Sequence, residues 1–241
     1  MNFRYKLSIY AIIIVFGIAC HRQKITYQPI AEPFAPDYAL NRFEQSIQNY
    51  EKEDKQRGTS QGEILFYGSS SWVYWKTLKE DMAPLPVLNR GFGGSTIPEL
   101  IHYAPRILFP YQPKMVVVYG GENDISGNKY KSPEQVYDSF RAFCSMVWKQ
   151  LPQTQIIYVS MKMSPSRRKH WSDIKKANAM IATFCKGKNL GYIDINPVLF
   201  RPDGNVKSEF YTADSLHINA QGYKSYTEII KPVLTKKYKK K

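Results

Sequence analysis

The chain contains 241 residues, enough for one domain and for two only if both are small, so a large multidomain protein is not expected. Charged residues make up 22% and hydrophobic residues 43% of the chain, with 18 Tyr, 12 Phe and 4 Trp, which is too apolar for an intrinsically disordered protein. The formal net charge of +14 permits a polyanionic partner, but the sequence has no helix-turn-helix, zinc-finger or RNA-binding motif, so we expect no nucleic-acid partner.

Residues 1–19 have the pattern of a secretion signal. Arg4 and Lys6 precede an uncharged stretch, Leu7–Ala19, which is shorter than the roughly 20 residues that a membrane-spanning helix needs. The stretch ends at Cys20 and resembles a bacterial lipoprotein signal, in which the cysteine is lipidated and becomes the mature N-terminus. Leucine is usual three residues before such a cysteine, whereas Gly17 stands here, so cleavage at a nearby small residue is the alternative.

Either form of processing takes the protein out of the cytoplasm. Lipidation of Cys20 attaches several acyl chains, and more than one chain gives stable membrane anchoring. Segment 20–36, which contains three prolines, is then a tether, and residues 37–241 form one domain with an N-terminal helix and a basic C-terminal tail. We therefore predict an exported lipoprotein, anchored in a membrane and located in the periplasm or at the cell surface.

The pattern of the domain predicts alternating strands and helices. Apolar residues three and four positions apart predict a first helix over Asp37–Lys55. Five apolar runs predict strands at Ile64–Tyr67, Val87–Leu88, Met115–Tyr119, Gln155–Ser160 and Tyr192–Ile195. Further helices are predicted at Ile97–Leu108, Pro133–Leu151, Trp171–Lys188 and Ala220–Leu234. Such alternation is typical of parallel βαβ units, so we expect an α/β fold, a three-layer α/β/α sandwich with a central parallel sheet of about five strands.

Basic residues are concentrated in two places. One cluster comprises Arg167, Arg168, Lys169, Lys175 and Lys176, and the other comprises Lys231, Lys236, Lys237, Lys239, Lys240 and Lys241. We interpret the C-terminal cluster as a solvated tail, with weak attraction to anionic lipid or polysaccharide as the alternative. Cys144 and Cys185 each lie inside a helical pattern; the compartment permits a disulfide, but we predict two separate buried thiols.

Ligands bind at the carboxyl ends of the strands in such sheets, so the residues after each predicted strand are candidates for chemistry. Gly68-Ser69-Ser70-Ser71 follows the first strand. A serine at a strand-to-helix turn has its hydroxyl near a helix N-terminus, whose partial positive charge favours an alkoxide-like state. Serine is also a preferred N-cap residue, so capping alone is the alternative.

The next two strands are followed by segments that can donate hydrogen bonds. Asn89–Thr96 follows the second strand, and its glycines let backbone N–H groups approach a ligand closely. Its spacing matches neither a dinucleotide-binding fingerprint nor a phosphate-binding loop, and a plain tight turn is the alternative. Gly120–Asp124 follows the third strand and contains Asn123, whose amide can donate into the same crevice unless it only caps a helix.

Asp214 and His217 lie three residues apart near the C-terminus. This separation lets one turn present both side chains on one face, so the carboxylate can orient the imidazole. The other histidines, His21, His102 and His170, are scattered, and no His-Glu-x-x-His motif or cysteine pair is present. We therefore expect neither a metal site nor a cofactor.

Together these four segments resemble the conserved blocks of the SGNH hydrolases, also known as GDSL-type esterases and lipases. The resemblance extends from about Ile64 to Leu234 and implies a flavodoxin-like fold. It also implies a catalytic triad in which Ser70 is the nucleophile, His217 the base and Asp214 the residue that orients the base. Ser164–Arg167, after the fourth strand, is similar to a loop beside the cleft of some members, and no role is assigned to it.

The same resemblance implies an oxyanion hole. Its donors are the backbone N–H groups of Ser70 and Gly94 and the side-chain amide of Asn123. The sequence departs from the family at Ser69, where aspartate is common, which leaves Ser69 and Ser71 as alternative nucleophiles.

The implied reaction is hydrolysis of a carboxylic ester. His217 takes the proton of Ser70 as the serine oxygen attacks the carbonyl carbon, and Asp214 holds the imidazole tautomer. Because the base must be neutral, activity is expected to fall below about pH 6. The expected substrate is an acetyl or other short acyl ester of a carbohydrate, because an exported bacterial protein meets polysaccharide. The alternatives are hydrolysis of lipid esters, a noncatalytic surface lipoprotein that binds glycan, and a polyanion-binding protein.

Overall fold

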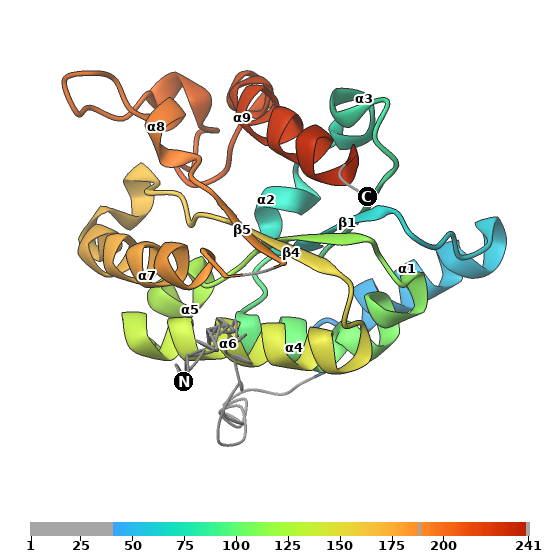
Figure 1. Ribbon diagram of the computed structural model, residues 1–241. Coiled ribbons are helices and arrows are strands. Elements are labelled where there is room, and N and C mark those ends of the chain that lie inside the picture. The colour runs from blue at the N-terminus through green and yellow to red at the C-terminus, as the bar shows by residue number, and fades with distance from the viewer. Residues whose placement is uncertain (1–40, 188, 240–241) are drawn as a thin grey trace, which may run out of the picture.

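The computed structural model describes residues 41–187 and 189–239 (Figure 1). The predicted signal, Cys20 and the tether lie outside the described residues. The sheet is all-parallel, with strand order β2-β1-β3-β4-β5. Its strands are β1 (Ile64–Gly68), β2 (Val87–Gly91), β3 (Met115–Tyr119), β4 (Gln155–Val159) and β5 (Leu190–Ile193).

Helices cover both faces of the sheet (Figure 1). Below the sheet in this view lie α1 (Glu44–Arg57), α4 (Ile97–Ile107), α5 (Glu122–Ser126), α6 (Pro133–Gln150) and α7 (Trp171–Phe184). Above it lie α2 (Ser70–Val73), α3 (Leu78–Met82), α8 (Asn196–Leu199) and α9 (Ala220–Lys239). Short 3-10 turns are η1 (Phe109–Tyr111), η2 (Pro165–His170) and η3 (Ser208–Phe210). The predicted three-layer α/β/α sandwich is confirmed.

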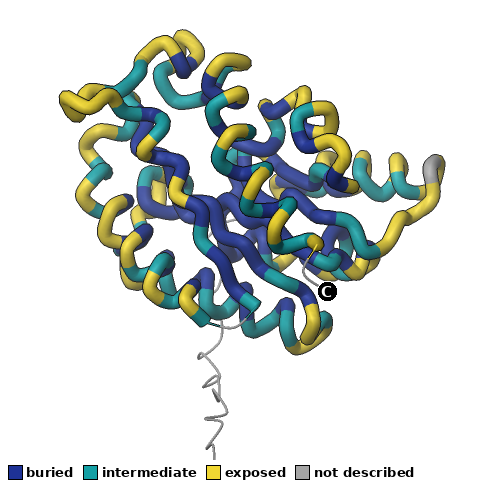
Figure 2. The backbone as a smooth tube through the Cα atoms, turned by 45° about the horizontal axis from the view of Figure 1, so that its top comes forward, coloured by how far each residue is buried: buried dark blue, intermediate teal, exposed yellow. Residues whose placement is uncertain are grey.

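Two apolar cores hold the layers together, one on each face of the sheet. Successive side chains of a strand point to opposite faces, so Leu65 and Tyr67 of β1 pack toward α4 and α6, whereas Ile64 and Phe66 pack toward α9. Every residue of β1 and β3 is buried (Figure 2). Burial on both faces fixes the carboxyl ends of these strands, and the loops that follow them start from rigid positions.

Gly68 ends β1 at a position where any side chain would collide with the neighbouring strand. A Cβ atom there would lie 2.2 Å from the carbonyl oxygen of Tyr119, the last residue of β3. The backbone N–H of Ser69 donates to that same carbonyl over 3.0 Å, and the N–H of Phe92 donates to the carbonyl of Gly68 over 2.8 Å. The start of α2 is thereby tied to the ends of both neighbouring strands.

Several predicted strand boundaries are wrong, and those of β2 and β5 differ most. β2 continues to Gly91 instead of ending at Leu88, because its polar residues find partners in the fold. The Arg90 side chain is 3% exposed and donates to the Tyr111 hydroxyl over 2.6 Å and to Asp54 over 2.5 Å. β5 begins at Leu190, two residues earlier than predicted, and α7 ends at Phe184 instead of Lys188.

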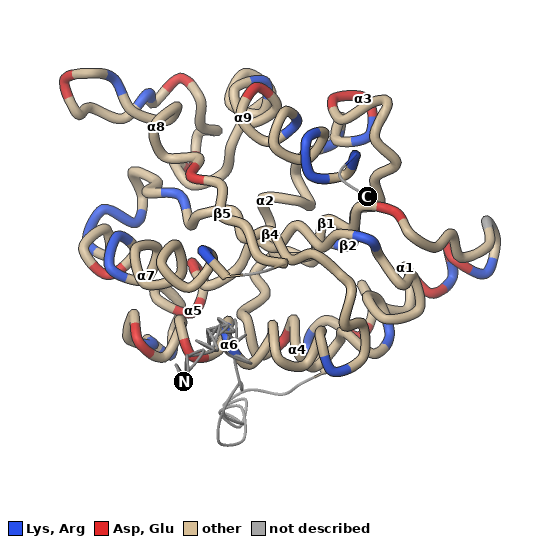
Figure 3. The backbone as a smooth tube through the Cα atoms, viewed as in Figure 1, with Lys and Arg blue, Asp and Glu red and all other residues tan. Residues whose placement is uncertain are grey.

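The helix ends also differ from the predictions. α1 begins at Glu44, and residues 37–40 of the predicted first helix lie outside the described residues. α9 runs to Lys239 instead of ending at Leu234, so Lys236, Lys237 and Lys239 are helical, although they are exposed or half-exposed. Figure 3 shows basic residues along the C-terminal part of this helix. Cations at a helix C-terminus interact favourably with its dipole, which stabilises this extension. Across the described residues, no helix is both long enough and apolar enough to span a membrane.

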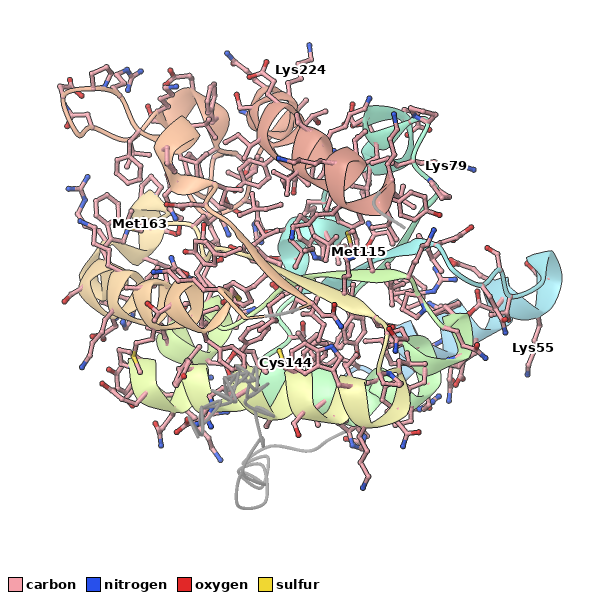
Figure 4. All side chains as sticks on the ribbon, viewed as in Figure 1. Lys55, Lys79, Met115, Cys144, Met163 and Lys224 are labelled. Carbon is pink, nitrogen blue, oxygen red and sulfur yellow. The ribbon has the colours of Figure 1, made fainter. Side chains whose placement is uncertain are left out.

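Cys144 and Cys185 are free and buried, which confirms the predicted separate thiols. Cys144 lies on α6, in the core between this helix and the sheet (Figure 4). Burial raises the pKa of both thiols, that of Cys185 to about 12. Because the thiolate is the reactive form, both cysteines are inert near neutral pH.

Candidate active site

The three consecutive serines at the end of β1 differ in their access to solvent. Ser69 and Ser71 are each 2% exposed, whereas Ser70, the first residue of α2, is partly exposed. Ser69 occupies the N-cap position of α2, but no side-chain hydrogen bond caps this helix. Burial of Trp72 against Phe66, with ring centroids 5.1 Å apart, sets the orientation of the turn. Capping therefore does not account for this run of serines.

Asp214 and His217 form the pair that their spacing predicts. Asp214 Oδ2 lies 2.5 Å from His217 Nδ1, and Asp214 Oδ1 accepts from the backbone N–H groups of Leu216 (2.8 Å) and His217 (2.9 Å) and from the Thr212 hydroxyl (2.7 Å). Ser215 takes a φ of +56°, which bends the chain back so that these bonds form. A carboxylate only accepts, so Nδ1 carries the proton and Nε2 is the nitrogen able to act as a base.

The hydrogen bonds of this turn keep Asp214 ionised. Partial burial on its own raises the pKa of a carboxyl group, but the bonds from His217, Leu216 and Thr212 outweigh it and hold the pKa of Asp214 well below its ordinary value of 3.8. Across residues 41–187 and 189–239, no group of three or more His, Cys, Asp or Glu side chains is arranged to hold a metal ion.

The turn that carries Asp214 and His217 faces the residues that follow α2. The ring of Tyr74, 49% exposed, lies 4.5 Å centroid to centroid from the ring of His217, and the Tyr74 N–H donates to the Ser70 carbonyl over 2.9 Å. The structure contains no direct hydrogen bond between the Ser70 hydroxyl and His217; such bonds are often long before substrate binds. A cavity of about 460 Å³ is lined by Tyr74, Lys76, Thr77, Thr212, Asp214, His217, Ile218, Asn219, Ala220 and Tyr223.

The segment between β2 and α4, Phe92–Thr96, is called the glycine loop here, and it lies beside the side-chain amide of Asn123, which follows β3. A Cβ at Gly93 would be 3.7 Å from the Ser70 Cβ, so this loop runs directly beside the serine. Gly94 adopts a φ of +85°, which disfavours any residue with a side chain, although open space surrounds it. The Asn123 Nδ2 donates to the carbonyl of Ser95 over 3.0 Å. Gly94 and Asn123 line a second cavity of about 390 Å³, with Arg42, Thr96, Asp124, Gly127, Asn128, Lys129 and Lys131.

Buried charges hold the glycine loop in place. Glu99, whose side chain is fully buried, accepts from the N–H (2.9 Å) and hydroxyl (2.8 Å) of Thr96. Arg42, just before α1, donates to Glu99 over 2.7 Å and to the carbonyl of Gly94 over 2.9 Å. Asp124 accepts from the N–H of Ile97 at the start of α4 over 3.1 Å. The carbonyl of Gly94 is thereby turned toward Arg42.

Sequence reasoning missed three side chains at this site. Tyr74 lies four residues after Ser70, a spacing that brings residues together at a helical turn and was available as a signal. Arg167 lies in the segment Ser164–Arg167, to which the sequence assigns no role, and it donates to Asn123 Oδ1 over 2.8 Å. Arg42 and Gly94 are 52 residues apart, and no local pattern links them.

A family comparison agrees with this arrangement. Residues 56–225 match the model of the GDSL-like lipase/acylhydrolase family. The chain belongs to this family. As a GDSL-like acylhydrolase it is a hydrolytic esterase, and the family assignment made from the strand-end motifs is confirmed. No curated protein matches the sequence.

Solved structures share the fold of this GDSL-like acylhydrolase. A GDSL-like lipase from Bacteroides thetaiotaomicron has 18% identity and a TM-score of 0.68, with 79% of this chain and 98% of that chain covered. The lipase/acylhydrolase from Enterococcus faecalis has 20% identity and a TM-score of 0.61, covering 73% and 96%. A carbohydrate esterase family 3 protein from Talaromyces cellulolyticus has 12% identity and a TM-score of 0.56, covering 74% and 98%.

Proposed function

We propose that this GDSL-like acylhydrolase uses Ser70 as its nucleophile and His217, oriented by Asp214, as its general base. The observation that carries this proposal is the 2.5 Å contact between Asp214 Oδ2 and His217 Nδ1. This pair lies beside the turn with three consecutive serines, of which Ser70 alone is partly exposed. Nε2 takes the Ser70 proton as the oxygen attacks the ester carbonyl, and returns it to the departing alcohol. Water then attacks the acyl-enzyme with the same base.

The oxyanion of the tetrahedral intermediate would be bound by three donors. These are the backbone N–H groups of Ser70 and Gly94 and the Nδ2–H of Asn123 that does not bond to Ser95. Support comes from the proximity of the glycine loop to Ser70 and from the anchoring of that loop by Arg42. Donors fixed before the reaction need no reorganisation when the charge develops, which is why they lower the barrier.

We propose an acetyl or other short acyl ester of a carbohydrate as the substrate. Hydroxyl, amide and charged side chains line both cavities, including Thr77, Thr212 and Asn219 in one and Asn128 and Lys131 in the other. Such groups can hydrogen-bond the hydroxyls of a polar alcohol, while the apolar parts of the same linings can pack against its ring carbons. A carbohydrate esterase among the structural neighbours agrees with this choice. Hydrolysis of lipid esters is the second candidate, because the family also includes lipases.

A chain-length series of 4-nitrophenyl esters, from acetyl to palmitoyl, tests this proposal. We expect kcat/KM to be highest for the acetyl ester and to fall steadily with chain length, and we expect the enzyme to release acetate from an acetylated polysaccharide. A maximum at long chains would overturn the carbohydrate proposal in favour of the lipid-ester alternative. A folded protein that hydrolyses no ester would contradict the esterase itself.

We also propose that the enzyme is exported and anchored in a membrane through lipidated Cys20. The support is the sequence of residues 1–20, which lie outside the described residues. In bacterial cells the wild-type protein should fractionate with membranes, whereas Cys20→Ser should be released in soluble form, because the acyl chains provide the anchor. A wild-type protein that is soluble after signal cleavage would contradict the lipid anchor but not export.

A further inference from the structure

Two hydrogen-bond partners fix the orientation of the Asn123 amide. Its Oδ1 accepts from Arg167 Nη2 over 2.8 Å, and its Nδ2 donates to the carbonyl of Ser95 over 3.0 Å. A guanidinium only donates and a carbonyl only accepts. If the amide rotated by half a turn, its NH2 would face the guanidinium and its oxygen would face the carbonyl, and both contacts would become repulsive. The NH2 group is therefore kept on the side of the glycine loop.

Arg167 is itself held by a buried ion pair. Its Nη1 lies 3.1 Å from Glu122 Oε1, while Glu122 Oε2 accepts from Lys162 Nζ over 2.7 Å and also from the Tyr119 hydroxyl. The exposed fractions of the side chains are 3% for Glu122, 1% for Lys162 and 17% for Arg167. Lys162 comes directly before Met163, which marks the loop after β4 in Figure 4.

Arg167 brings a guanidinium charge to the Asn123 amide. Burial on its own raises the pKa of Glu122, but attraction to Lys162 and Arg167 outweighs it and lowers this pKa below its ordinary value, so Glu122 is a carboxylate. Burial lowers the pKa of Lys162, although attraction to Glu122 opposes this effect. Arg167 directs the charge of its guanidinium at the Asn123 oxygen. A cation on the oxygen of an amide draws electron density from its nitrogen, which makes the N–H a stronger donor.

We propose that Arg167 is a positioning residue for ester hydrolysis: it orients and polarises the Asn123 amide for the oxyanion, and Glu122 and Lys162 hold Arg167 in place. The proposal rests on the proposed function, in which Asn123 is an oxyanion donor. It assigns a role to the segment Ser164–Arg167, whose purpose the sequence did not reveal. It also predicts that the effect of Arg167 is transmitted through a single side chain.

A purely structural role is the competing explanation. The N–H of Ser166 donates to the carbonyl of Ser215 over 3.1 Å, so η2 also contacts the turn that carries Asp214 and His217. Loss of Arg167 could then disturb the base instead of the oxyanion donor. The two explanations differ in one respect: only the positioning role disappears when Asn123 has no amide.

A double-mutant cycle tests the proposal on the full protein with an acetyl ester. Asn123→Ala should lower kcat by about 10²–10³-fold. Arg167→Met should lower kcat by roughly 10- to 100-fold with KM little changed, because a charge-assisted hydrogen bond is lost in the transition state. In the Asn123→Ala background, Arg167→Met should cost almost nothing more. Arg168→Met, which removes the same charge from an exposed neighbour, should keep wild-type kcat and KM.

Arg167→Lys serves as a second variant in case Arg167→Met does not fold. Lysine keeps the charge but cannot bridge Glu122 and Asn123 with two nitrogens, so kcat should fall less, and again only when Asn123 is present. Additive losses in the cycle, or wild-type kcat for either Arg167 variant, would overturn the inference. An Asn123→Ala enzyme with wild-type kcat would instead overturn the proposed oxyanion role of Asn123. The proposed role of Ser70 would be unaffected, because Ser70→Ala tests it independently.

Discussion

Ser70→Ala should abolish ester hydrolysis, with a fall in kcat on the order of 10⁵–10⁶. No covalent acyl-enzyme can form without the serine oxygen, and the donors that remain supply only weak catalysis. Ser69 and Ser71 cannot take over, because each is only 2% exposed. The melting temperature should stay near that of the wild type, since Ser70 is partly exposed and the change removes one oxygen atom. Steady-state kinetics and thermal unfolding measure both quantities.

Ser69→Ala and Ser71→Ala are matched controls for this experiment. Both remove the same atom from adjacent positions of the same turn, and both should keep most of the activity. Adding His217→Ala to Ser70→Ala should cause little further loss, because the two residues act as one unit. An active Ser70→Ala enzyme together with an inactive Ser71→Ala enzyme would move the nucleophile to Ser71 and refute the assignment.

Asp214→Asn should reduce kcat by about 10³–10⁴-fold while the protein remains folded. The asparagine oxygen can still accept from the backbone N–H groups of Leu216 and His217. Its NH2 group, however, would face His217 Nδ1 and favour the tautomer with the proton on Nε2. That nitrogen could then no longer accept the proton of Ser70. Kinetics on the acetyl ester, with circular dichroism to verify folding, provide the measurement.

The pH profile adds a check on the same pair. A carboxyl group whose pKa is lowered by folding contributes stability above its unfolded pKa, and this contribution is lost as the pH falls through the lower folded value. Asp214 therefore stays ionised in the folded enzyme throughout the range above pH 4. Any loss of wild-type activity between pH 7 and pH 5 must then come from a group other than Asp214. Asp203→Asn, in an exposed loop, is the control and should leave both rate and profile unchanged.

Local pattern was enough to predict the architecture and the contact between Asp214 and His217. Apolar runs and helical periodicity are properties of one segment at a time, so all five strands and the layer arrangement could be predicted from them. The Asp214–His217 pair was also predictable, because a separation of three residues brings both side chains into one turn. The ends of β2 and α9 were not predicted, because the residues that extend them have partners far away along the chain. Arg90 of β2 bonds to Tyr111, and Tyr238 of α9 packs against Lys114.

Only the tertiary structure decided how the motifs are supported. The sequence favoured Ser70 only through the family resemblance and left Ser69 and Ser71 as alternatives, because the exposure of each serine depends on how α2 packs against the sheet. It could not link Arg167 to Asn123, 44 residues earlier, because this contact requires β3 and β4 to be neighbours with their carboxyl ends at the same edge. The chain by itself determined which chemical groups are available at the strand ends. Packing of the layers determined which group is exposed, which way the amide lies, and which charge holds it there.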